Sequence, residues 1–141
     1  MLKSVNWIAV LVAVVLLEVL GYLWYGPLFG ARWLAALGHA ADKSNMTTAY
    51  TLGAANTVII VLGLSWLLQR LGAASLQAAL GAALAAWFFF NFTTMAVDYL
   101  YIGLSAELVA INMGYQLAAY LLAALVLAAI KPKAASAAAA A

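Results

Sequence analysis

The stretch NWIAVLVAVVLLEVLGYLWYGPLFG, from Asn6 to Gly30, decides the fold of this chain. It begins with an apolar run of about 20 residues, the length that an α-helix needs to cross roughly 30 Å of hydrocarbon. The run is continuously apolar, whereas the strands of a membrane barrel alternate between apolar and polar residues. Pro27 follows and disfavours helical geometry at Gly26. The stretch therefore predicts a membrane-spanning helix that ends near Gly26.

The composition of the whole chain indicates an integral membrane protein. Of the 141 residues, 70% are hydrophobic and 7% are charged, and the mean hydropathy is +1.10. Soluble domains are about half apolar and a quarter charged. The basic residues are scattered at the ends of apolar runs and form no patch, which argues against a nucleic-acid partner. The absence of cysteine excludes disulfides, thiolate metal sites and cysteine nucleophiles.

Four segments are long and apolar enough to span a bilayer. They run approximately from Asn6 to Tyr25, Ala49 to Leu68, Leu76 to Val97 and Leu108 to Ile130. The first is longer than the apolar part of a signal peptide, and no A-x-A-like cleavage site follows it. Short turns between the segments predict an all-α bundle with up-down-up-down topology. We expect one transmembrane domain over residues 1–133 and a low-complexity Ala-rich tail over residues 134–141.

The basic residues predict the orientation of the bundle. Four of them share the side of the two termini and the middle loop: Lys3, Arg70, Lys131 and Lys133. The first and third loops carry only Arg32 and Lys43. Because loops rich in Lys and Arg stay in the cytoplasm, both termini are predicted to be cytoplasmic. The expected location is the bacterial inner membrane.

An aromatic block surrounds the exit of the first helix. It consists of five side chains: Tyr22, Trp24, Tyr25, Phe29 and Trp33. Rings of this kind are favoured at the depth of the lipid headgroups, because one end is apolar and the other is wet. Phe29 and Trp33 lie four residues apart, which predicts a short helix in the membrane interface. An aromatic belt followed by a helix stop accounts for most of this block without any ligand.

Glu18 is the ionisable residue that requires an explanation, because acids near the membrane centre are costly. Counting residues along the helices places four amides at similar or slightly more external depths: Asn56, Asn91, Asn112 and Gln116. These residues predict a buried polar layer with Glu18. In one interpretation a protonated Glu18 joins helices by hydrogen bonds. In the other it is a proton-responsive or cation-binding carboxylate. Glu18 and Gly21 have the E-x-x-G spacing found in the first helix of small multidrug-resistance exporters, which the chain resembles in outline.

Two blocks carry a further resemblance. The first is the Gly-x-x-Trp-Tyr-x-Pro-x-Phe-Gly pattern from Gly21 to Gly30, followed by Trp33, and the second is INMGYQL from Ile111 to Leu117. Together they resemble the small multi-pass membrane proteins of the domain-of-unknown-function 1761 family (DUF1761). The resemblance extends over the chain up to Ile130. It implies a compact four-helix membrane protein of unassigned function, with no catalytic or binding residue to carry over.

Other sequence features argue against an enzyme. The chain has no Ser-His-Asp set, no Gly-rich phosphate loop and no paired carboxylates, and we expect no cofactor. His39 and Asp42 lie three apart in a loop, but two ligands do not make a metal site. Ser44 is the expected N-cap of the second span. Ser105 is expected to cap the fourth, where Glu107 complements the positive end of the helix.

The leading functional hypothesis is a non-enzymatic accessory or packing subunit that binds other membrane proteins, for example in a respiratory or photosynthetic complex. Small residues on several helix faces permit close helix approach: Gly53, Gly63, Ala79, Ala82, Ala83, Ala86, Ala118, Ala119, Ala123 and Ala124. A homo-oligomer is equally compatible with these faces. The alternative hypothesis is a proton-coupled small-molecule or cation transporter that uses Glu18.

Overall fold

A computed structural model describes residues 5–38 and 45–130, and every regular element in this part of the chain is helical. The elements are α1 (Trp7–Leu23), the π-helical turn η2 (Trp24–Leu28), α2 (Gly30–Leu37), α3 (Met46–Arg70), α4 (Leu76–Ala86), the π-helical turn η3 (Trp87–Phe92), α5 (Thr93–Tyr101) and α6 (Ala106–Ala129). The predicted all-helical class is confirmed for these residues.

Four helical segments are long and apolar enough to cross a membrane, as predicted. They are Trp7–Leu28, Met46–Arg70, Leu76–Tyr101 and Ala106–Ala129. Each differs from its predicted bounds by a few residues, because polar and turn residues extend the helices beyond the apolar runs. The lengths and compositions fit a multi-pass membrane protein.

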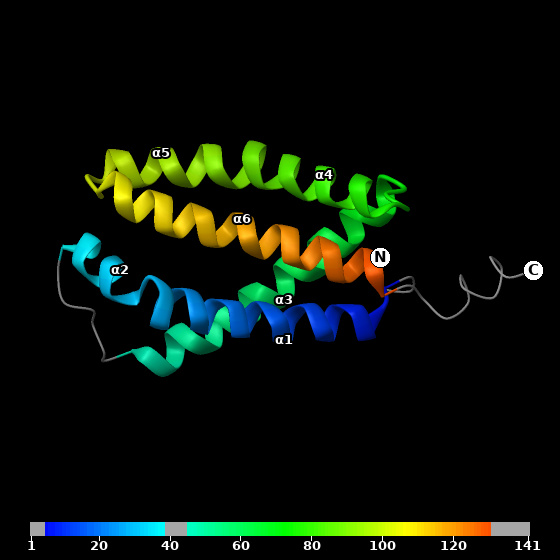
Figure 1. Ribbon diagram of the computed structural model, residues 1–141, viewed down its shortest axis with the longest axis horizontal. Coiled ribbons are helices and arrows are strands. Elements are labelled where there is room, and N and C mark those ends of the chain that lie inside the picture. The colour runs from blue at the N-terminus through cyan, green and yellow to red at the C-terminus, as the bar shows by residue number, and fades with distance from the viewer. Residues whose placement is uncertain (1–4, 39–44, 131–141) are drawn as a thin grey trace, which may run out of the picture.

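The segments alternate in direction, and α6 lies at the centre of the bundle (Figure 1). It packs against α1 on one side and against α4 and α5 on the other, and it also contacts α2 and α3. The start of α1 and the end of α6 meet at one end, where the Asn6 side chain donates a 2.7 Å hydrogen bond to the Ile130 carbonyl oxygen. The helix α2 and the turn between α5 and α6 lie at the opposite end (Figure 1).

Side-chain caps fix where three of the helices begin. The side-chain oxygens of Asn6, Ser75 and Ser105 each accept a hydrogen bond from the backbone N–H three residues later. Such a bond satisfies one of the free N–H groups of the first turn. The predicted cap at Ser105 is therefore confirmed, and Glu107 lies in the first turn of α6. Ser44 lies outside the described residues, and α3 begins at Met46.

Small residues bring α4 and α6 close together. Ala79 and Ala83 of α4 are fully buried, and they belong to one apolar cluster with Ala119, Ala123 and Ala124 of α6. Helices whose facing residues are small approach closely and gain dispersion contacts along their length. Ala82 packs against the same cluster, so six of the ten small residues that suggested a partner protein make contacts inside this bundle.

The bundle is tightly packed at one end and open at the other. In the C-terminal half of α3, Val61, Leu64 and Leu68 are buried against the rest of the chain. Residues 45–56, by contrast, are all exposed. Figure 1 shows α3 crossing the bundle diagonally, so that its two halves have different neighbours. The divergence of its N-terminal half leaves space beside α1, α5 and α6.

Two π-helical turns interrupt the spans, and no sequence pattern predicted either of them. In η2 the Phe29 N–H donates to the Trp24 carbonyl oxygen five residues earlier, at 2.9 Å. Pro27 lies inside this turn and has no N–H to donate, so the regular α-helical pattern ends there. The predicted helix end near Gly26 becomes a kink that leads directly into α2. The second turn, η3, widens the third span between α4 and α5.

Candidate ligand-binding recess

The aromatic block after α1 packs inward. Four of its rings form pairs with one another or with Tyr115 of α6: Trp24 with Phe29 at 4.7 Å, Tyr25 with Tyr115 at 5.1 Å, and Tyr25 with Trp33 at 5.7 Å between ring centroids. Tyr22, in contrast, is 76% exposed. These four rings therefore pack within the bundle, and the depth of the block at the headgroups stays a prediction. The kink in η2 turns them toward α6.

Three hydrogen bonds attach this aromatic cluster to α6. The indole N–H of Trp24 donates to the backbone oxygen of Ile111 at 3.1 Å. The Tyr25 hydroxyl and the Trp33 indole N–H both donate to Oδ1 of Asn112, each at 3.1 Å. Bonds of this kind remove the cost of leaving polar groups unpaired in apolar surroundings. Asn112 is thus the point at which α6 holds both η2 and α2.

A salt bridge joins the other side of α2 to α6. The guanidinium of Arg32 lies 2.7 Å from the Glu107 carboxylate, and the two side chains are 67% and 47% exposed. Exposed pairs contribute roughly 0.2–1 kcal/mol. The Ser105 hydroxyl adds a 3.4 Å bond to the Ala36 carbonyl oxygen. The position of α2 therefore depends more on the aromatic cluster than on the ion pair.

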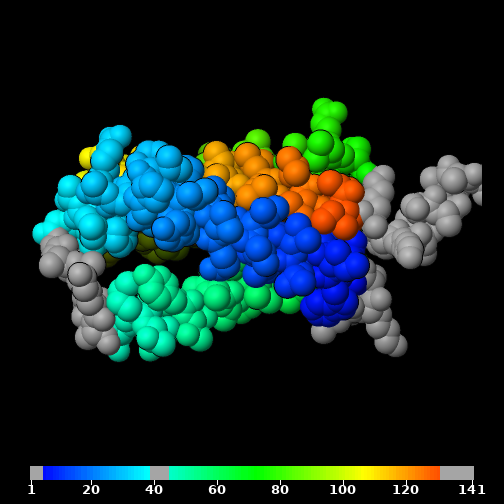
Figure 2. Space-filling view, turned by 60° about the horizontal axis from the view of Figure 1, so that its bottom comes forward, coloured from blue at the N-terminus to red at the C-terminus, as the bar shows by residue number. Residues whose placement is uncertain are grey.

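Beyond the aromatic cluster lies a recess of about 950 Å³ between α3 and the remaining helices. Figure 2 shows the hollow between the N-terminal half of α3 and the α1–α2 segment. Four amides line it, and they come from α3, η3 and α6: Asn56, Asn91, Asn112 and Gln116. Aromatic side chains line it as well: Tyr25, Trp33, Tyr50, Tyr99 and Tyr120. The described part of the chain contributes no Lys, Arg, Asp or Glu to this lining.

Glu18 lies in a smaller pocket of about 200 Å³ next to this recess. The two share Ala49, Tyr50 and Asn56 of α3 as lining residues. Glu18 and Asn56 are exposed on the isolated chain, which corrects their predicted burial. The reason is the divergence of the N-terminal half of α3, which leaves this part of the polar layer uncovered. Within the described residues Glu18 forms no hydrogen bond or ion pair.

The remaining amides of the predicted layer differ in their bonding. Asn112 and Gln116 are half-buried and lie one turn apart on α6. Asn91 belongs to η3, and its side-chain oxygen is buried without a hydrogen-bond partner among the described residues. The indole N–H of Trp87, four residues earlier, is also buried without one. π-Helical turns are frequent at functional sites, and this one contributes Asn91 to the lining of the recess.

A comparison with known families identifies the chain. Residues 8–128 match the family model described as "Protein of unknown function (DUF1761)". The chain belongs to the DUF1761 family. Searches of curated proteins and of solved structures gave no match. The resemblance noted in the sequence is thereby confirmed, and the matched residues of this DUF1761 protein include Glu18 and the whole lining of the recess.

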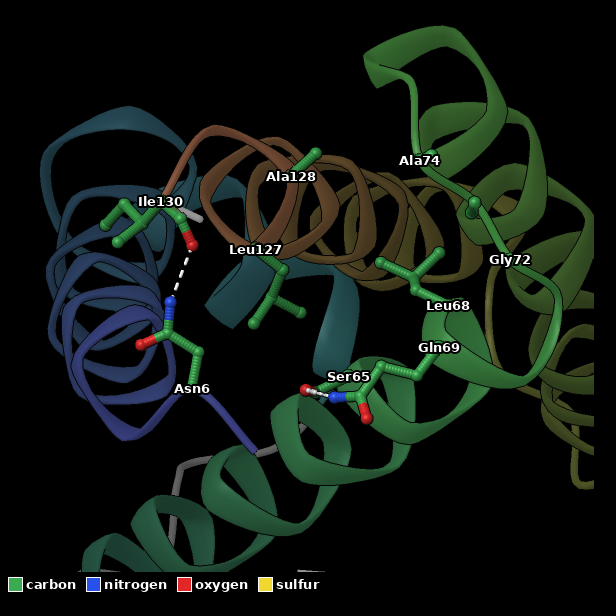
Figure 3. Close-up of a pocket in the computed structure, with 10 residues that line it drawn as sticks. Asn6, Ser65, Leu68, Gln69, Gly72, Ala74, Leu127, Ala128 and Ile130 are labelled. Atoms are coloured by element: carbon green, nitrogen blue, oxygen red, sulfur yellow. Dashed lines mark hydrogen bonds between the residues drawn. The ribbon is translucent and has the colours of Figure 1, made fainter. Parts of the chain in front are cut away.

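A second pocket of this DUF1761 protein lies at the opposite end of the bundle and has a volume of about 430 Å³. Figure 3 shows Asn6 bonded to the Ile130 oxygen across its mouth and Gln69 bonded to Ser65 on α3. Ser65 is buried, and the rest of the lining is mostly apolar. The polar groups drawn here bond to one another, so this pocket offers a ligand less unused bonding capacity than the recess.

The residues described in this DUF1761 protein offer no acidic or histidine cluster. Over residues 5–38 and 45–130, no group of three or more His, Asp or Glu side chains is placed to hold a metal ion. His39 and Asp42 lie outside these residues. The chemistry available at the recess is therefore that of amides, aromatic rings and the neighbouring carboxylate.

Proposed function

We propose that this protein binds a small amphipathic molecule in the recess and moves it across the membrane in exchange for a proton carried by Glu18. The observation that supports this proposal is the amide-lined recess of about 950 Å³ next to the pocket of Glu18. Its size lies in the range of small-molecule sites, roughly 300–1,000 Å³. Such sites are mostly apolar and carry a few convergent polar groups, which matches this lining.

The lining favours neutral or cationic ligands over anions. None of the described residues that line the recess or the pocket of Glu18 is basic, so an anion finds no partner of opposite charge among them. Aromatic faces attract cations through the ring quadrupole, and Glu18 supplies a carboxylate nearby. A cation that enters the pocket and a proton on Glu18 compete for the same negative charge. This competition is the physical basis of the proposed exchange.

An accessory role in a larger membrane complex is the second candidate. The exposed residues 46–56 of α3 favour it, because a partner helix placed there would cover them. The small residues support it less strongly, since six of the ten pack inside the bundle. No enzymatic activity and no cofactor are part of either proposal. The transport experiment below separates the two roles, because an accessory subunit moves no substrate on its own.

We expect reconstituted protein to accumulate ethidium, a slowly permeating aromatic cation, in liposomes with an acidic interior. Encapsulated DNA reports entry through the rise in ethidium fluorescence. Glu18→Gln keeps a neutral hydrogen-bonding group of similar shape but cannot release a proton, so the protein-dependent uptake is expected to fall to the level of empty liposomes. The matched control is Asp98→Asn, which neutralises an exposed acid outside both pockets. Uptake that survives Glu18→Gln, or no uptake by the wild type, would contradict the proposal.

We further propose that the protein lies in the bacterial inner membrane with both termini in the cytoplasm. The predicted orientation rests on Lys3, Arg70, Lys131 and Lys133. A C-terminal fusion to green fluorescent protein is expected to fluoresce, and a C-terminal alkaline phosphatase fusion is expected to be inactive. A phosphatase fusion after Gly38, in the first loop, is the control and is expected to be active. The reverse pattern would overturn the orientation.

A further inference from the structure

The pocket of Glu18 is small and rich in side chains that carry oxygen. Its volume is about 200 Å³, which corresponds to a few water molecules at roughly 30 Å³ each. The oxygen-bearing side chains come from α1, α3 and α6: Glu18, Tyr50, Asn56, Thr57 and Tyr115. Each can accept a hydrogen bond. The described residues contribute no Lys, Arg or His to the lining, so among them a cation meets acceptors and no positive charge.

The glycine at position 21 admits the Tyr115 hydroxyl to the neighbourhood of Glu18. A Cβ at Gly21 would lie 3.2 Å from the hydroxyl oxygen of Tyr115, so this oxygen lies against the backbone of α1. Gly21 follows Glu18 by three residues, which puts the two on one face of the helix, one turn apart. Tyr115 and Glu18 are close enough to interact electrostatically. The E-x-x-G spacing therefore brings a hydroxyl of α6 close to the carboxylate of α1.

Both groups are free to bond to a ligand. Within residues 5–38 and 45–130 the Glu18 carboxylate and the Tyr115 hydroxyl form no hydrogen bond. Glu18 is exposed, and the hydroxyl oxygen of the half-buried Tyr115 also keeps accessible surface. A ligand group that enters this small pocket can therefore reach two unused oxygens, one from each helix.

We propose that the pocket binds the primary ammonium group of a ligand, which donates one N–H to the Glu18 carboxylate and another to the hydroxyl oxygen of Tyr115. A primary ammonium has three N–H donors, as the lysine side chain does, so it can bond to both oxygens at once. A quaternary ammonium has the same charge and no N–H. Hydrogen bonds to a charged group are the stronger ones, so the two kinds of cation are discriminated.

The neighbouring recess accommodates the rest of such a ligand. It shares Ala49, Tyr50 and Asn56 with the pocket of Glu18, so a body attached to the ammonium group extends among the aromatic rings. The ligand class is thus a primary amine with an aromatic or aliphatic body. This inference rests on the proposed function for the choice of site, but its test measures binding and needs no transport.

Two matched ligands test the inference on the intact protein in lipid nanodiscs at pH 8, where few protons compete for Glu18. The first is 4-phenylbutylammonium. The second is N,N,N-trimethyl-4-phenylbutylammonium, which keeps the charge and the body and has no N–H. Dissociation constants are measured by isothermal titration calorimetry, with empty nanodiscs as the reference for partition into lipid. We expect the primary ammonium to bind more than tenfold more tightly. Equal affinities, or no binding of the primary ammonium, would overturn the inference.

A substitution at Tyr115 then tests its share of the preference. Tyr115→Phe removes the hydroxyl and keeps the ring that packs against Tyr25. The primary ammonium is expected to bind about tenfold more weakly to this variant, and the trimethyl ligand with unchanged affinity. The control is Tyr120→Phe, which removes a hydroxyl from the same helix at a residue that lines the recess but not the pocket of Glu18. It is expected to keep both affinities. Equal losses for the two ligands in Tyr115→Phe would contradict the proposed hydrogen bond.

The stability of Tyr115→Phe separates ligand binding from a structural role. The hydroxyl has no partner among the described residues, so the midpoint of unfolding without ligand is expected to stay the same. A lower midpoint would show that the hydroxyl already bonds inside the bundle, and it would refute the inference. Ethidium uptake without a preference for the primary ammonium would remove this inference alone. The preference without uptake would support the inference and remove the transport proposal alone.

Discussion

Asn112→Leu is expected to lower the free energy of unfolding by about 2 kcal/mol, because two hydrogen-bond donors lose their shared acceptor. Those donors are the Tyr25 hydroxyl and the Trp33 indole N–H. Both side chains are half-buried, so water replaces the lost bonds only in part. The loss is also expected to loosen α2, which Trp33 holds against α6.

The measurement is unfolding of the purified protein by SDS in mixed micelles, followed by circular dichroism. Gln116→Leu is the matched control, since Gln116 lies one turn further along α6 and lines the same recess. The Gln116 side chain forms no hydrogen bond with any described residue. The free energy of unfolding of Gln116→Leu is therefore expected to stay within about 0.5 kcal/mol of the wild-type value. Equal losses in the two variants would show that the shared acceptor has no special role.

A double-mutant cycle with Trp33→Phe tests the cause of the loss. Once Trp33 no longer donates, Asn112→Leu has one fewer bond to break. The two substitutions together are therefore expected to cost less than the sum of their separate effects, as for residues in direct contact. Additive effects would contradict the hydrogen bond between Trp33 and Asn112.

Gly30→Ala is expected to cost about 1–3 kcal/mol, because the added methyl group has no space. A Cβ at position 30 would lie 2.6 Å from the backbone oxygen of Tyr25 and 3.2 Å from its carbonyl carbon. Both atoms belong to the backbone of η2, which cannot move aside as a flexible side chain can. Relief requires the kink to open, and opening the kink shifts the start of α2.

The same SDS titration checks this prediction, with Gly63→Ala as its control. Gly63 lies inside α3, and a Cβ there meets nothing within 4 Å. Alanine is the better helix former by about 1 kcal/mol, so the control is expected to be as stable as the wild type or more stable. A Gly30→Ala protein of unchanged stability would show that the close approach between Gly30 and Tyr25 is not required.

The spans could be predicted from the sequence because their signal is local. An apolar run such as Asn6–Tyr25 identifies a helix by its length alone, and short turns fix the alternation of direction. The cap at Ser105 is equally local, since donor and acceptor lie three residues apart. The family was recognisable from the pattern between Gly21 and Gly30.

The candidate site could be predicted only in part. Counting residues along each helix places amides at a given depth, and the four amides do line one recess. Depth does not say which way a side chain points or whether a neighbouring helix covers it. Glu18 and Asn56 were therefore expected to be buried and are exposed. The inward orientation of Trp24, Tyr25 and Trp33 was not predicted. Pro27 indicates where the regular helix ends, but it does not indicate the π-helical turn that directs these rings toward α6.

The sequence by itself determined the number, length and alternating direction of the membrane-spanning helices, because these depend on apolar runs and turn residues close together in the chain. Only the tertiary structure decided which polar groups are paired. The donors to Asn112 come from residues 87 and 79 positions away, and the recess exists because α3 diverges from helices that lie far from it in sequence. Such contacts depend on how whole helices pack against one another. Because the faces of these helices are similarly apolar, the sequence of one helix does not indicate which face meets which neighbour.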